Sequence, residues 1–116
     1  MKTFAYFEIF LYLCKKVMYL TSHIPQIKKL CEQHKVDKLY AFGSVLTDKF
    51  SKDSDVDLLY RFRDDVSVNE YADNFFDFQY KLEEVLLRSV DLVSEKHLQN
   101  PYFIKEVNAT KQLIYG

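Results

Sequence analysis

Two short motifs, separated by ten residues, constrain this 116-residue chain more than any other feature. The first is Gly43-Ser44, which follows residues 38–42, a run that is typical of a short strand. Gly43 is the only glycine in the interior of the chain, and a backbone without a Cβ can approach a ligand closely. The second motif is Asp55-Val56-Asp57. The pair predicts a strand that ends in a glycine turn, a polar connection and a second strand that begins with carboxylates.

The second strand is predicted over residues 55–62, where apolar and polar side chains alternate with a period of two. Asp55 and Asp57 are therefore expected on one face of a sheet, and Val56 and Leu58 on the other. Two neighbouring carboxylates repel each other, so a protein keeps such a pair either in open water, as a solvated strand edge, or around a cation.

Gly-Ser, ten residues and Asp-x-Asp resemble the signature of the nucleotidyltransferase superfamily that has the DNA polymerase beta-type palm. The flanking Phe-Gly-Ser and Ser-Asp-Val-Asp-Leu-Leu are most similar to its minimal nucleotidyltransferases (MNT), which are often encoded beside a HEPN-domain protein as antitoxin and toxin. The resemblance covers residues 18–116. It implies a small α/β (α+β) domain with a palm-like sheet.

The resemblance also implies a site for nucleotidyl transfer. Asp55 and Asp57 match the pair that bridges two metal ions, and Asp91 matches the third carboxylate, which holds the acceptor-side ion and takes up the hydroxyl proton. Gly43 and Ser44 match the nucleotide-binding turn, where free N–H groups at a helix start can cradle phosphate. The implied cofactors are two Mg²⁺ ions, with Mn²⁺ as an alternative, and ATP is the implied substrate. Carboxylates are ligands that Mg²⁺ prefers.

The residues that follow Ser44 depart from the family pattern. Many members carry small residues, Arg or Gly here, whereas this chain has Val45-Leu46-Thr47-Asp48. That removes a candidate triphosphate-binding Arg and leaves Lys49 or Lys52 as substitutes. Nucleotide affinity and base preference therefore stay open.

A calcium-binding loop is the competing interpretation of these aspartates. Loop positions one, three, five and twelve would be filled by Asp53, Asp55, Asp57 and Asp64. Position six requires glycine, and Leu58 stands there, so the calcium-loop interpretation fails.

Elsewhere the chain predicts further helices over residues 22–34, 68–88 and 100–108, and strands over 89–94 and 111–115. The expected fold is a small mixed sheet with helices on one face. The other face, with the aspartates, is expected to stay open as the cleft.

Single positions add detail to these elements. We expect Thr21 or Ser22 to cap the first helix, with Pro25 in its first turn, and His23 and His34 on its polar side or at its ends. An aromatic and aliphatic stripe in the 68–88 helix is expected to face the core.

The composition describes one domain. Residues 18–116 are the predicted nucleotidyltransferase domain, and residues 1–17 are either an extra helix or, as we favour, a leader ahead of a start at Met18. A net charge of −1 gives no basic footprint, so strong nucleic-acid binding is not expected. Cys14 and Cys31 lack the spacing of a zinc site, which favours a reduced cytoplasmic protein. The apolar run over residues 4–14 is too short to span a bilayer.

Three functions remain open. The leading hypothesis is an enzyme that transfers AMP from ATP to a hydroxyl of a HEPN toxin, because all three carboxylates and Ser44 are present. The second is a non-catalytic module that neutralises a HEPN partner by contact alone. The third is a small-molecule transferase of the aminoglycoside type, although such enzymes usually carry an additional helical domain that this chain has no room for.

Overall fold

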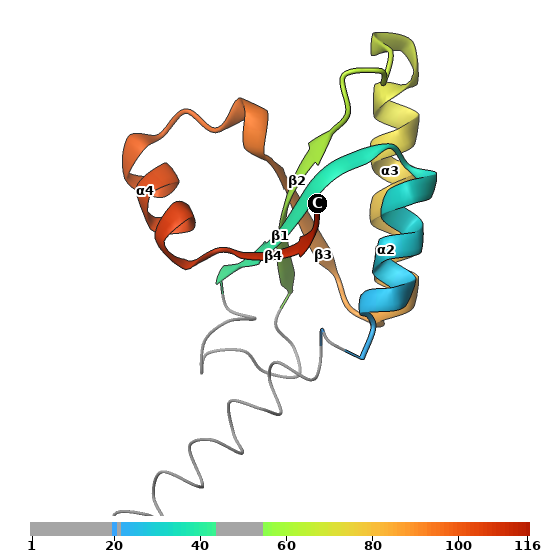
Figure 1. Cartoon of the computed structure of the whole chain (residues 1–116), viewed down its shortest axis with the longest axis horizontal. Coiled ribbons are helices and arrows are strands. Elements are labelled where there is room, and N and C mark those ends of the chain that lie inside the picture. The colour runs from blue at the N-terminus through green and yellow to red at the C-terminus, as the bar shows by residue number, and fades with distance from the viewer. Residues whose placement is uncertain (1–19, 21, 44–54) are drawn as a thin grey trace, which may run out of the picture.

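The computed structural model describes residues 20, 22–43 and 55–116, which form a four-stranded sheet with the strand order β3-β2-β1-β4 (Figure 1). β1 (Val36–Phe42) pairs antiparallel with β2 (Val56–Phe62) and with β4 (Gln112–Tyr115). β2 pairs in parallel with β3 (Val90–Ser94). The predicted mixed sheet is therefore confirmed.

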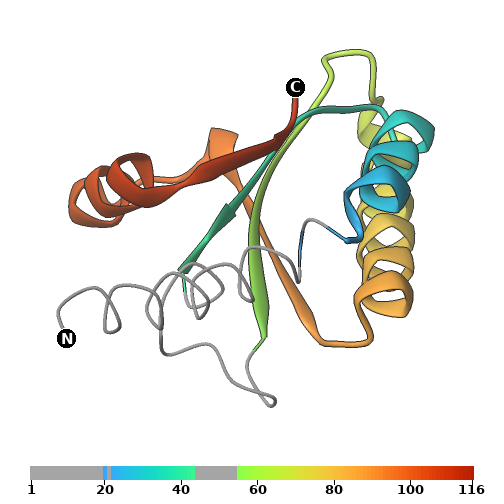
Figure 2. The same ribbon diagram turned by 60° about the horizontal axis from the view of Figure 1, so that its bottom comes forward.

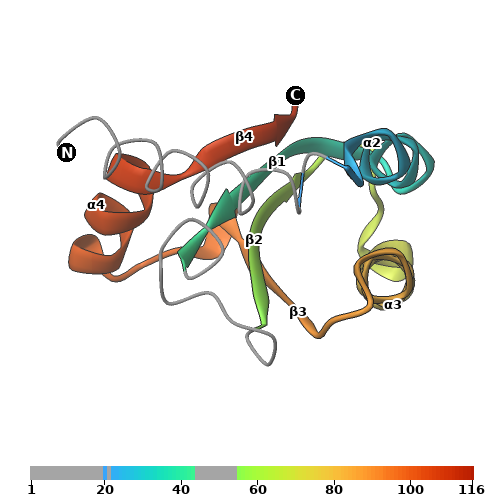
Figure 3. The same cartoon turned by 90° about the horizontal axis from the view of Figure 1, so that it is seen from below.

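The helices lie on both sides of this sheet. α2 (Ile24–Gln33) and α3 (Val68–Leu86) cover one face, whereas α4 (Pro101–Thr110) lies on the opposite side (Figures 1 and 3). A short 3-10 helix, η2 (Glu95–His97), links β3 to the chain that leads into α4. The prediction that helices cover only one face holds for α2 and α3 and is wrong for α4, since Val107 packs in a cluster with strand residues of the second face.

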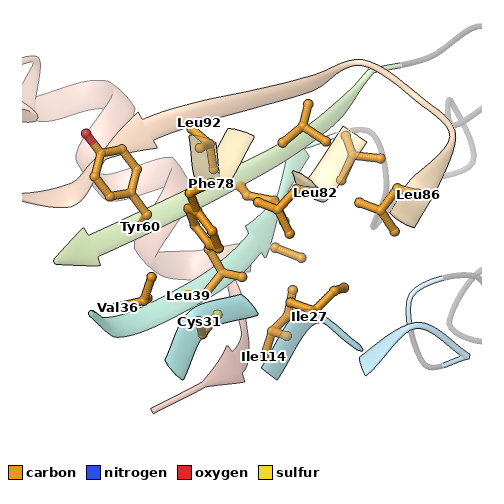
Figure 4. Close-up of a cluster of buried hydrophobic side chains, with 14 of the residues drawn as sticks. Ile27, Cys31, Val36, Leu39, Tyr60, Phe78, Leu82, Leu86, Leu92 and Ile114 are labelled. Atoms are coloured by element: carbon orange, nitrogen blue, oxygen red, sulfur yellow. The ribbon is translucent and has the colours of Figure 1, made fainter. Parts of the chain in front are cut away.

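The main core lies between the sheet and the helix pair α2 and α3 (Figure 4). Val56 and Leu58 are fully buried on this face, which confirms the period of two that predicted β2. The helices contribute apolar side chains spaced three or four residues apart: Ile27 and Cys31 from α2, and Phe78, Leu82 and Leu86 from α3. Figure 2 shows the same helix pair lying along the sheet, away from α4.

Side chains set where two of the helices begin. The Ser67 hydroxyl accepts from the Glu70 backbone N–H, and the Glu70 carboxylate accepts from the Ser67 N–H, a capping box that starts α3. The Asn100 side chain caps α4, accepting from the Tyr102 backbone N–H. The prediction for α2 is wrong, because its N-cap is His23, whose side chain makes no capping hydrogen bond and instead lies 3.3 Å from Oε1 of Gln26, rather than Thr21 or Ser22.

Cys31 is buried in the core, and burial raises the pKa of its thiol to about 12. The thiol therefore stays protonated and serves as an apolar side chain. Cys14, the predicted leader over residues 1–17, and the predicted helix that starts at Ser44 all lie outside the described residues. In the part of the chain that is described, no helix has the length and apolar character needed to cross a membrane.

His34 joins α2 to α3. Its Nδ1 lies 2.7 Å from the Leu30 carbonyl oxygen and its Nε2 lies 2.6 Å from Oδ2 of Asp77. Both partners are acceptors when Asp77 is ionised, so the ring satisfies both only with a proton on each nitrogen. The hydrogen bond from His34, and then the one from Lys81, hold the pKa of Asp77 below its ordinary value of 3.8. The prediction that both histidines lie at helix ends is confirmed, but His34 is buried there.

We expect His34→Ala to lower the free energy of unfolding by about 2 kcal/mol, because it removes a charge-assisted hydrogen bond and leaves a gap beside Phe78. The matched control is His23→Ala at the other end of α2, where a change within about 0.5 kcal/mol is expected for a partly exposed side chain. Urea unfolding at neutral pH measures both. Since the pKa of Asp77 is lowered on folding, the contribution of the pair should be lost as the pH falls below about 4. Equal stability of the two variants would contradict this role for His34.

Candidate active site

Parallel pairing of β2 with β3 brings two of the three predicted aspartates together. Asp57 lies opposite Asp91 in the register, between the pairs that Val56 and Leu58 make with β3. Val56 and Leu58 are buried in the main core, so the two aspartates lie on the other face of the sheet. Neighbouring strands lie about 4.8 Å apart, which puts the two carboxylates within reach of one cation. The strand of Asp91 therefore lies beside that of Asp57.

Asp55 occupies a different position. It is exposed and precedes β2, which begins at Val56, where the backbone N–H donates to the carbonyl of Ser89. Among the residues that the structure describes, no group of three or more His, Cys, Asp or Glu side chains is close enough together to hold a metal ion. The described arrangement thus pairs Asp57 with Asp91 and leaves Asp55 just outside the sheet.

β1 extends this arrangement into a row across three strands. Phe42 pairs with Asp57, and Asp57 pairs with Asp91. The next row toward the middle of the sheet is apolar: Tyr40, Leu59 and Val93. α4 packs over this apolar row, where Val107 is buried against Leu59 and Phe42. The acidic row therefore lies at the end of the sheet that α4 only partly covers.

Gly43 directly follows β1, and its backbone lies so close to the Asp57 carboxylate that no side chain fits between them. Its φ is +73°, a conformation that L side chains rarely adopt. A Cβ at this position would lie 2.5 Å from Oδ2 of Asp57, closer than real Cβ atoms come. Only glycine therefore allows the chain to turn here and the carboxylate to keep its place. Ser44 and the candidate phosphate ligands Lys49 and Lys52 lie outside the described residues.

A pocket of about 500 Å³ opens beside Asp57, between the sheet and α4. Its walls come from β1, β2, α4 and β4: Phe42, Gly43, Asp57, Phe103, Glu106, Val107, Thr110 and Gln112. The α4 residues among them are spaced three or four apart, so they share one side of the helix. The prediction that this face stays open is therefore correct only in part, because a pocket lies beside Asp57 but α4 covers part of the face and forms one wall of the pocket.

The sequence motifs predicted no role for α4 in the site. The sequence does indicate that one side of this helix is buried, because Phe103 and Val107 form a short apolar stripe and much of the rest of the helix is charged or exposed. That pattern shows which side of the helix is buried. The pattern does not show on which face of the sheet the helix packs. Because α4 packs on the face of Asp57, it borders the cleft.

The residues at the acidic row fit a divalent cation. Carboxylate oxygens are the hard ligands that Mg²⁺ prefers, and Asp57 and Asp91 supply them from adjacent strands. Gly43 contributes open space against the Asp57 carboxylate, where any side chain would intrude. Such a site can hold a metal–phosphate complex close to the backbone.

Comparison with known proteins agrees with this geometry. A family model described as "Polymerase beta, Nucleotidyltransferase" matches residues 25–116. A protein of Methanocaldococcus jannaschii, named as a candidate protein adenylyltransferase, is 33% identical over 88 residues, which are 76% of this chain and 84% of that protein. A solved structure described as a candidate minimal nucleotidyltransferase is 29% identical and has a TM-score of 0.64, over 80% of this chain and 90% of the other.

Among other solved structures that share the fold is one with a toxin partner. It is that of a tri-AMPylated Shewanella oneidensis HEPN toxin in complex with MNT antitoxin, in which the matching chain has a TM-score of 0.57 at 21% identity. The match covers 83% of this chain and 71% of the other.

Proposed function

The chain belongs to the polymerase beta family of nucleotidyltransferases, and from this premise we propose that it transfers AMP from ATP to a hydroxyl group of another protein. The observation that carries the proposal is the contact of Gly43 with the Asp57 carboxylate, beside Asp91 on the next strand. It joins the two motifs of the sequence at one point of the sheet.

The proposed site residues have separate tasks. Asp55, Asp57 and Asp91 would hold two Mg²⁺ ions, and such ions, when bound, activate the attacking oxygen and neutralise the charge on the leaving pyrophosphate. Asp55 stands just outside the sheet, directly before β2, and its side chain would complete the set. Gly43 and Ser44 would bind the triphosphate.

The transfer itself exchanges one bond for another. The acceptor oxygen forms a bond to the α-phosphorus of ATP, and the bond from that phosphorus to the bridging oxygen breaks, so pyrophosphate leaves. The proton of the acceptor hydroxyl goes to Asp91, which is exposed at the edge strand β3 and can be reached from outside. Asp57 is half-buried on β2 between β1 and β3, and its carboxylate would hold a metal ion against the phosphate.

A HEPN toxin is the proposed acceptor. The support is the fold shared with an MNT antitoxin whose structure contains an AMPylated HEPN toxin. An added AMP group is anionic and bulky, so beside a site that must bind RNA phosphate it opposes substrate binding by charge and by volume.

We test this with ATP labelled on the α-phosphate, mixed with Mg²⁺, this protein and a HEPN protein encoded beside it. The label should appear on the HEPN protein, should need Mg²⁺ and should be absent when the label is on the γ-phosphate. A HEPN protein that binds this chain tightly and takes up no label would contradict the proposal.

A further inference from the structure

The pocket beneath α4 lies on one side of Asp57, and Asp91 lies on the other. β2 carries Asp57 between β1, which gives the pocket Phe42 and Gly43, and β3, which carries Asp91. An acceptor hydroxyl that approaches Asp91 therefore does not enter the pocket. The pocket is open to a group attached to a phosphate that rests against Gly43 and Asp57.

The walls of the pocket suit a flat aromatic ring system. Phe42 and Phe103 meet edge to face with ring centroids 6.0 Å apart, and Val107, in the same apolar cluster, is 2% exposed. Ligand pockets are typically 300–1,000 Å³ in volume, mostly apolar and supplied with a few polar groups, which matches this one at about 500 Å³.

Two polar side chains of the pocket, Thr110 and Glu106, differ in the hydrogen bonds that they can make with a ligand. The Thr110 hydroxyl donates to the Glu106 backbone carbonyl at 3.0 Å, so its proton is already used. The Glu106 carboxylate accepts hydrogen bonds and cannot donate when ionised. It would therefore pair with a base edge that carries N–H groups, such as an exocyclic amine.

We propose that this pocket binds the nucleoside of the nucleoside triphosphate, with the base against Phe103 and its amino edge toward Glu106. The assignment rests on the proposed function, because only a nucleotidyltransferase needs a nucleotide here. It makes α4 the element that selects the base, a role that neither sequence motif supplies.

The test measures binding of two probes in the presence of Mg²⁺, a non-hydrolysable ATP analogue and inorganic tripolyphosphate, by calorimetry. Base stacking on an aromatic side chain is worth enough that Phe103→Ala should weaken binding of the analogue by about 10-fold or more. Tripolyphosphate has no nucleoside, so its affinity should not change. Phe103→Leu, which keeps most of the apolar volume, guards against loss of fold and should weaken the analogue by a smaller factor.

The matched control is Tyr102→Ala. Tyr102 directly precedes Phe103 in α4 but is 84% exposed, so this variant should bind both probes as the wild type does. Unchanged affinity of both Phe103 variants for the analogue would overturn the pocket assignment and leave the proposed function standing. Equal weakening of both probes would also overturn it, because the effect would then not depend on the nucleoside. A wild-type protein that bound neither probe would overturn the proposed function itself, and the assignment with it.

Discussion

Asp57→Asn is expected to lower the rate of AMP transfer by about 1,000-fold or more, because the metal-bound transition state loses several kcal/mol of stabilisation and each 1.36 kcal/mol is tenfold in rate. Asp57 is the central residue of the row Phe42, Asp57 and Asp91, so no other described carboxylate stands in its position. Asparagine keeps the shape and removes the charge. The melting temperature should stay the same or rise slightly, since repulsion from Asp91 is relieved.

The control for this variant is Asp65→Asn. Asp65 is an exposed carboxylate beyond the other end of β2, where it pairs with Arg63 at 3.4 Å, and its loss should leave transfer unchanged. Transfer is followed by label incorporation at saturating ATP and Mg²⁺. Full activity of the Asp57 variant would rule out its role as a metal ligand.

Gly43→Ala should have the second largest effect. A left-handed backbone conformation costs a residue with a side chain about 1–2 kcal/mol, so the free energy of unfolding should fall by about that amount. Activity should fall further, by about 100-fold, because the new Cβ would force the Asp57 carboxylate away from its place and a displacement of 1 Å can cost that much. Activity is measured well below the melting temperature so that unfolding does not contribute.

Gly116→Ala separates strain from damage to the site. Gly116 also has a positive φ, +123°, and an added Cβ there would lie 2.8 Å from Cγ of Lys38, near the opposite end of β1 from Gly43. It should be destabilising without loss of transfer. Equal activity of the two alanine variants would show that the contact of Gly43 with Asp57 has no part in the reaction.

The sheet could be predicted because its signals are local. Val56 and Leu58 alternate with Asp57. Once the two apolar side chains are buried in the core, the period of two places Asp57 on the opposite face of the sheet. The pairing of Asp57 with Asp91 was not itself predicted, although the helix predicted over residues 68–88 is the long connection that parallel strands need.

The side of the sheet on which α4 packs, and the burial of His34, could not be predicted from the sequence. Both depend on contacts between segments far apart in the chain. His34 is 43 residues from Asp77, and no local pattern marks a histidine that will meet a carboxylate on another helix. The stripe of α4 is equally compatible with either face of the sheet, and only the acidic row on the second face makes the choice matter for function.

The most direct test of the central claim is the intact mass of the proposed acceptor protein after incubation with this chain, ATP and Mg²⁺, followed by separation of the two. A transferase leaves the acceptor heavier by one or more AMP groups and still inhibited after separation, whereas the Asp57→Asn variant leaves its mass unchanged. An acceptor that regains full activity on separation, with no added mass, would contradict the account and show that this chain acts by contact alone.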